Sequence, residues 1–236
     1  MILSGTGLNA ATSLASACAL TRRRRVFLVD LPGQPGLSSS TGPPQRRHMK
    51  GYGRWLDEVI PQLTIEPVVL VGHSLGAAVA LSSSPSSQVA GLVLVNPWGF
   101  VAVHQSAGFR VLRWKWLIDP STKNSERFLS HLISPRFVPD AALIVWFHLL
   151  GQHCNGIRYD RPLPPALVHR WRDYGTPVIV ATGSHDRLVS PDQLRGPVYS
   201  LLGSDVQTIT GCGHLGLREA PTAIATLVSS VTSHHG

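Results

Sequence analysis

Residues 68–81 of this 236-residue chain read Val68-Val69-Leu70-Val71-Gly72-His73-Ser74-Leu75-Gly76-Ala77-Ala78-Val79-Ala80-Leu81. The aliphatic residues at the start predict a strand buried on both faces, and the residues after Ser74 predict a helix with small residues on its packing side. The turn between them has the pattern Gly-x-Ser-x-Gly, in which a serine hydroxyl is held above the end of a sheet. Such a short pattern also arises by chance in ordinary turns, but the flanking strand and helix favour a nucleophile. Ser74 is therefore a candidate nucleophilic serine.

The composition restricts the class of protein. A length of 236 residues suits one large domain or a core with an insertion, and 43% apolar residues exclude a disordered or fibrous chain. The formal net charge is +8 and the pI is near 10.1. The arginines are scattered and not interleaved with aromatic residues, so nucleic acid is not an expected partner. Three widely spaced cysteines predict neither a disulfide framework nor a metal site, which favours a reducing compartment.

The first 20 residues are apolar, but they do not have the pattern of a signal peptide. The basic residues Arg22 to Arg25 follow this segment instead of preceding it, and Gly5, Gly7 and Asn9 interrupt it. No apolar run in the chain approaches the length that crosses a bilayer. We therefore expect a soluble, cytoplasmic protein without membrane insertion.

Apolar runs that predict strands alternate along the chain with segments that predict helices. The expected strands lie at residues 1–3, 26–30, 68–71, 89–95, 177–182 and 206–209. The expected helices include residues 10–20, capped by Asn9, residues 52–60, stopped by Pro61, and residues 223–231. Such alternation predicts an α/β fold, with a mostly parallel sheet of about six strands and helices on both faces.

The alternation stops between residues 98 and 171. This stretch has no strand-like run, and it holds five of the six tryptophans and five of the six phenylalanines. The aromatic residues could form the core of a helical subdomain, or some of them could face an apolar substrate pocket. Trp98 and Phe100 follow directly on the strand at 89–95, at the edge where open α/β sheets bind ligands, so they are candidate substrate-binding residues.

Two further loops strengthen the catalytic interpretation of Ser74. Gly183-Ser184-His185-Asp186 follows the strand at 177–182, and Gly211-Cys212-Gly213-His214 follows the strand at 206–209. With the Gly-x-Ser-x-Gly turn and the segment Asp30-Leu31-Pro32-Gly33, these motifs resemble the α/β-hydrolase superfamily over nearly the whole chain. The chain order of serine, aspartate and histidine is the order found in that superfamily. His73, His185 and the histidines of residues 98–171 are interpreted as satisfied or solvent-facing residues.

The resemblance implies a fold and a set of site residues. Residues 1–97 and 172–236 would form the core, and residues 98–171 would form a helical cap. The two antiparallel strands that usually come first in the family are not found, so either the start is truncated or the sheet is two strands short. About six strands are expected. Ser74, Asp186 and His214 would be the catalytic residues, and the backbone N–H groups of Leu75 and Thr6 would form the oxyanion hole. No metal or organic cofactor is expected.

The other acidic positions of the chain fit the role of the catalytic acid less well than Asp186. Position 96, the family's alternative acid position, holds an asparagine, which cannot carry the charge. Only Asp186 follows a strand at the expected sheet edge without another evident role in a turn or cap.

The function expected from these residues is that of a serine hydrolase. It would cleave an ester, a thioester or a similar acyl bond of a small, largely apolar substrate. Two other classes stay open, because a fold alone does not decide among reactions. One is other chemistry on the same scaffold, such as hydrolysis of a carbon–carbon bond, acyl transfer or a lyase reaction. The other is a non-catalytic receptor for a small ligand. The sequence does not indicate the oligomeric state.

Overall fold

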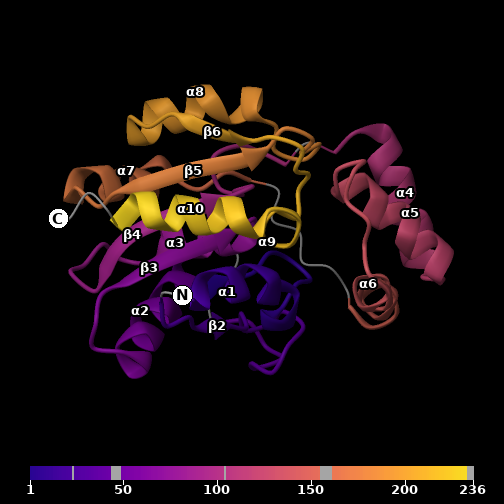
Figure 1. Ribbon diagram of the computed structural model, residues 1–236, viewed down its shortest axis with the longest axis horizontal. Coiled ribbons are helices and arrows are strands. Elements are labelled where there is room, and N and C mark those ends of the chain that lie inside the picture. Colours follow the sequence, from indigo (N-terminus) through magenta and orange to yellow (C-terminus); the bar gives the residue numbers. More distant parts are fainter. Residues whose placement is uncertain (23, 44–48, 104, 155–160, 233–236) are drawn as a thin grey trace.

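The computed structural model describes residues 1–22, 24–43, 49–103, 105–154 and 161–232. These residues form one six-stranded sheet in the order β2-β1-β3-β4-β5-β6, and every neighbouring pair of strands is parallel (Figure 1). The strands are β1 (Ile2–Leu3), β2 (Leu28–Val29), β3 (Val68–His73), β4 (Val89–Val95), β5 (Val178–Gly183) and β6 (Val206–Ile209). The expected parallel sheet of about six strands is therefore confirmed.

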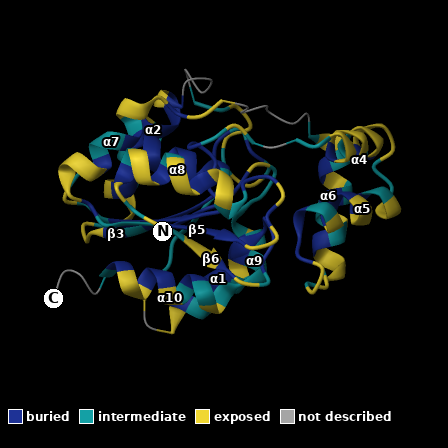
Figure 2. Ribbon diagram, turned by 90° about the horizontal axis from the view of Figure 1, so that it is seen from above, coloured by how far each residue is buried: buried dark blue, intermediate teal, exposed yellow. Residues whose placement is uncertain are grey.

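Helices cover both faces of the sheet (Figure 2). One face carries α2 (Lys50–Leu63), α3 (Leu75–Ser82), α7 (Pro165–Tyr174) and α8 (Pro191–Leu202). The other face carries the 3-10 helix Ala10–Ser13 with α1 (Leu14–Thr21), α9 (Gly216–Glu219) and α10 (Pro221–Thr232). Each face of the sheet has its own apolar core. The strands are continuous aliphatic runs, so they present apolar side chains to both faces. No helix in the described ranges is both long and apolar enough to cross a bilayer.

The central strands β3 and β4 bring the loops that follow them to the same edge of the sheet. They pair in parallel, with Gly72 opposite Leu94 and His73 opposite Val95. The carboxyl ends of parallel strands lie at one edge of the sheet, where ligands bind in open α/β folds. The residues that follow β3, β4, β5 and β6 therefore meet at this edge.

A third group of helices lies beyond that edge of the sheet, on the right of Figure 1. It consists of α4 (Ala107–Ile118), α5 (Thr122–Leu132) and α6 (Ala141–His153). Their inward side chains form an aromatic core, in which the rings of Trp116 and Phe128 stack with centroids 4.5 Å apart. Leu188 and Leu215, from loops of the sheet, pack into the same cluster.

The helical group is shorter than the cap expected at residues 98–171. Trp98, Phe100 and Trp171 all belong to the core on the face of the sheet that carries α2, α3, α7 and α8. The indole N–H of Trp171 donates to the carbonyl of Leu81 at 3.0 Å. Their partners come from distant parts of the chain, which the local sequence does not reveal. Residues 155–160 of the expected cap and 233–236 of the expected core lie outside the described residues.

Two local expectations have different outcomes. Asn9 caps the first helical turn, because its side chain accepts a hydrogen bond from the N–H of Thr12. Pro61, however, lies inside α2 and does not end it. The apolar face of α2 up to Ile60 is buried in the core, including Tyr52 and Leu56. Beyond the proline, Gln62 and Leu63 are exposed, and the helix closes with a hydrogen bond from the Thr64 N–H to the Ile60 carbonyl.

Candidate active site

Ser74 occupies a strained turn between β3 and α3. Its φ of 50° and ψ of −112° place a non-glycine residue in a region that such residues rarely adopt. The turn is held by backbone hydrogen bonds, from the Ser74 N–H to Val95 and from the Trp98 N–H to the Ser74 carbonyl. A Cβ at Gly76 would lie 2.1 Å from the carbonyl oxygen of Leu3, so this close approach requires glycine.

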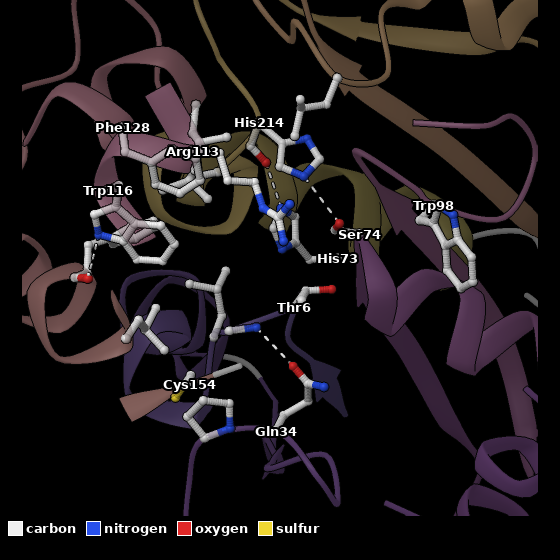
Figure 3. Close-up of a pocket in the computed structure, with 18 of the residues that line it drawn as sticks. Thr6, Gln34, His73, Ser74, Trp98, Arg113, Trp116, Phe128, Cys154 and His214 are labelled. Carbon is white, nitrogen blue, oxygen red and sulfur yellow. Dashed lines mark hydrogen bonds between the residues drawn. The ribbon is translucent and has the colours of Figure 1, made fainter. Parts of the chain in front are cut away.

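Ser74, His214 and Asp186 form a hydrogen-bonded chain. His214 Nε2 lies 3.2 Å from Ser74 Oγ (Figure 3). His214 Nδ1 lies 2.8 Å from Asp186 Oδ2. The three residues follow β3, β6 and β5, so the parallel sheet brings them to one edge. In this arrangement the serine hydroxyl donates to Nε2, and the Nδ1–H donates to the carboxylate.

Asp186 is a buried carboxylate that is surrounded by donors. Oδ1 accepts from the backbone N–H groups of Leu188 and Val189, while Oδ2 accepts from Asn96 Nδ2 and Thr182 Oγ1. Burial by itself would raise the pKa of Asp186, but the charge of His214, its hydrogen bond and those from the N–H groups of Val189 and Leu188 outweigh it and lower the pKa below its ordinary value. Asp186 is therefore ionised at neutral pH, as a partner of an imidazolium must be.

Asn96 is a part of the site that the sequence did not reveal as functional. It is fully buried, has a φ of 46°, and its amide nitrogen also donates to the carbonyl of Gly213 at 3.0 Å. It thereby joins the loop of the acid to the loop of the histidine. The signal in the sequence is its position directly after β4, which is the family's alternative acid position.

The backbone of His214 is held by a second histidine. His73 Nε2 lies 2.6 Å from the carbonyl oxygen of His214, and because a carbonyl only accepts, Nε2 carries the proton. Burial, together with the nearby His214, lowers the pKa of His73 to about 3. His73 is therefore a neutral donor that fixes the position of the His214 loop.

Glu219 holds the same loop from the other side. Its carboxylate accepts the backbone N–H groups of Gly213 and Leu215, which flank His214, and that of Ser134 after α5. The N–H of His214 itself donates to the carbonyl of Leu132, at the end of α5. The histidine loop is thus joined directly to the helical group beyond the sheet edge.

The two expected oxyanion donors, the N–H groups of Leu75 and Thr6, come from different segments of the chain. Leu75 is the first residue of α3, and Thr6 lies in a tight turn in which the Leu8 N–H donates to the Gly5 carbonyl. The N–H of Gly7 donates to Gln34 Oε1 at 2.9 Å, so the buried Gln34 holds this turn. The sequence did not single out Gln34 as a site residue, although it stands in the proline- and glycine-rich loop after β2.

A cavity of about 590 Å³ lies over Ser74, between the sheet edge and the helical group. Figure 3 shows Trp116 and Phe128 on one side of Ser74 and Trp98 on the other. The tryptophan and phenylalanine side chains that line the cavity are Trp98, Phe109, Trp116, Phe128 and Phe147.

Trp98 thus lines the cavity, as expected for a substrate-binding residue, whereas Phe100 is not among the described lining residues. Gly99 turns the chain with a φ of 126°, its carbonyl accepts from the Leu163 N–H, and Phe100 is directed into the core.

Comparison with known proteins agrees with this geometry. A family model described as "Alpha/beta hydrolase family" matches residues 2–227. Lipase LipV of Mycobacterium tuberculosis is 32% identical over 183 residues, which are 70% of this chain and 68% of that protein. Carboxylesterase CesB from Bacillus subtilis has a TM-score of 0.80 at 16% identity, over 100% of this chain and 83% of that one. Naproxen esterase, also from Bacillus subtilis, has a TM-score of 0.77 at 17% identity, over 97% and 81%. The chain belongs to the alpha/beta hydrolase family.

Proposed function

We propose that the protein is a serine hydrolase that cleaves an ester, thioester or similar acyl bond of a small, largely apolar substrate. The observation that carries this proposal is the hydrogen-bonded chain from Ser74 through His214 to Asp186 at the floor of the cavity. The family membership and the lipase and carboxylesterase relatives support the same class of reaction.

The first half of the reaction forms an acyl-enzyme. Ser74 Oγ attacks the carbonyl carbon of the substrate while His214 Nε2 accepts its proton. Asp186 holds the other ring nitrogen and stabilises the imidazolium. The resulting oxyanion accepts hydrogen bonds from the N–H groups of Leu75 and Thr6, and the first of these also lies at the positive end of α3. As the tetrahedral intermediate collapses, the bond to the leaving alcohol or thiol breaks and His214 protonates that group.

The second half releases the acid. His214 removes a proton from a water molecule, the hydroxide attacks the acyl carbon, and Ser74 regains its proton from the imidazolium when the ester bond to the enzyme breaks. Every step uses side chains and backbone groups of the described site. Helices α4 to α6 act as a cap, whose aromatic side chains bind the apolar part of the substrate.

The nucleophile is tested by covalent labelling. An organophosphonate should add once, at Ser74, and the hydrolysis of a short p-nitrophenyl ester should stop in proportion to the labelling, as followed by mass spectrometry and absorbance. Ser74→Ala should abolish both. Labelling at another residue, or no labelling of folded protein, would favour a receptor that only binds its ligand. The cytoplasmic location stays a prediction from the sequence.

A further inference from the structure

One helix of the cap presents a cation to the cavity. Phe109, Arg113 and Trp116 are four and three residues apart on α4, so they share one face of the helix, and all three line the cavity. The two aromatic residues are buried and Arg113 is half-buried. Figure 3 shows the side chain of Arg113 extending from the side of Phe128 and Trp116 into the cavity, toward Ser74 and His214 in that view.

No described residue neutralises this cation. The described lining residues include no aspartate or glutamate, and Arg113 is their only lysine or arginine. Within the described part of the chain, its guanidinium has neither an ion pair nor a hydrogen bond. Other arginines, such as Arg195 and Arg218, do have carboxylate partners. A guanidinium stays charged at all ordinary pH values, and partial removal from water costs free energy unless an anion compensates for it. A ligand that carries the anion would provide that compensation.

We propose that Arg113 binds a carboxylate of the substrate, so that the site prefers esters with a negative charge to neutral esters of similar size. This inference rests on the proposed function and specifies its substrate class. A guanidinium suits the role because it can form two parallel hydrogen bonds with a carboxylate. The apolar wall around it limits access of water, which strengthens such a contact. Arg113 is thus a specificity-determining residue, and the apolar remainder of the substrate packs against the aromatic wall.

The test compares two pairs of matched esters. In the first pair the charge lies in the acyl group: mono-p-nitrophenyl glutarate is compared with p-nitrophenyl pentanoate. In the second pair it lies in the leaving group: the butyrate ester of para-hydroxybenzoate is compared with that of para-hydroxybenzamide. Because each variant is compared with the wild type on the same ester, the intrinsic reactivity of the ester cancels. The pair that responds also shows which part of the substrate carries the carboxylate.

Arg113→Gln should lower kcat/KM for the charged member of at least one pair by about 10- to 100-fold, the range expected for hydrogen bonds to a charged group. The neutral member should change by less than about threefold. Arg113→Lys should retain part of the preference, because it keeps the charge without the planar fork. Arg110→Gln is the matched control, since Arg110 is an exposed arginine on the same helix and is not among the lining residues. It should leave both members nearly unchanged.

Three results would overturn the proposal: an equal loss on charged and neutral esters, a loss in Arg110→Gln as large as in Arg113→Gln, or no loss at all. If wild-type protein hydrolyses none of the four esters and is not labelled by phosphonate, the proposed reaction fails instead. Arg113 is then judged by calorimetry on Ser74→Ala protein, with monomethyl glutarate as the charged probe and dimethyl glutarate as the neutral one. Adding Arg113→Gln to this protein should weaken the binding of monomethyl glutarate and leave that of dimethyl glutarate unchanged. If Ser74→Ala protein with Arg113 intact binds the two probes equally, the anion site is rejected.

Discussion

The side-chain nitrogen Nδ2 of Asn96 lies 2.8 Å from Oδ2 of Asp186, the same oxygen that faces Nδ1 of His214. One carboxylate oxygen therefore accepts from the imidazole and from a buried amide at once. The amide has no charge and cannot titrate, so of these two side chains only Asp186 carries a negative charge. The contact fixes the orientation of the carboxylate without competing for the proton of His214.

Replacing Asp186 by asparagine should lower kcat by up to about 10⁴-fold, because His214 loses its orienting and charge-stabilising partner. Steady-state hydrolysis of a p-nitrophenyl ester, with circular dichroism to verify the fold, measures this loss. Asp192→Asn is the matched control, since Asp192 is an exposed carboxylate whose ion pair among the described residues is with Arg195 alone. Near-normal turnover in Asp186→Asn, with activity abolished in Asp192→Asn or Asp30→Asn, would mean that the acid is assigned to the wrong residue.

Gln34 should act through the turn that carries Thr6. Gln34→Ala removes the acceptor of the Gly7 N–H, so the expected oxyanion donor is no longer held in place. Loss of a complete oxyanion donor costs about 10²- to 10³-fold in kcat, and a displaced donor should cost less, roughly tenfold. Gln34→Glu keeps the acceptor oxygen and should recover most of the loss. A change confined to KM in Gln34→Ala would indicate that Gln34 contacts the substrate instead.

Glu219 should link the stability of the fold to the placement of His214. Glu219→Gln replaces one of the two accepting oxygens by a donor, which leaves at least one of the three backbone N–H groups unpaired. The free energy of unfolding in urea should fall by about 1–3 kcal/mol, and kcat should fall with it. Glu126→Gln, at an exposed position on α5, is the control for the lost charge. An unchanged kcat in a destabilised Glu219→Gln protein would restrict Glu219 to a structural role.

The buried His73 should make folding stability depend on pH. Its pKa is about 3 in the folded protein and near 6.5 in the unfolded chain, so between these values only the unfolded chain binds the proton. Stability should therefore fall as the pH decreases from about 6.5 toward 3, by up to about 1.4 kcal/mol per pH unit from this residue.

His73→Gln keeps a donor near the Nε2 position but cannot titrate. Urea unfolding, followed by tryptophan fluorescence at several pH values in this range, should show wild-type protein losing stability faster than the variant. The lowered pKa of Asp186 also destabilises the fold in acid, but it is present in both proteins and cancels in the comparison. Parallel pH dependences would show that His73 is not neutral in the folded state.

The amino-acid sequence by itself determined the layout of the fold. The runs at 89–95 and 206–209 coincide with β4 and β6, and the cap at Asn9 begins a helix as expected. These features are local, because a strand buried on both faces needs an unbroken aliphatic run and a cap needs one side chain three residues from its donor. The order of Ser74, Asp186 and His214 along the chain was readable for the same reason, since each follows a recognisable strand.

Only the tertiary structure decided which side chains surround these residues. Asn96, Gln34 and Glu219 each act on a backbone or side-chain group that lies on another element. Trp98 and Phe100 are two residues apart and belong to the same core, yet of the two only Trp98 is among the described residues that line the cavity. Side chains in a folded protein are placed by contacts between segments that are distant along the chain, and no pattern within one segment records what the opposite segment provides.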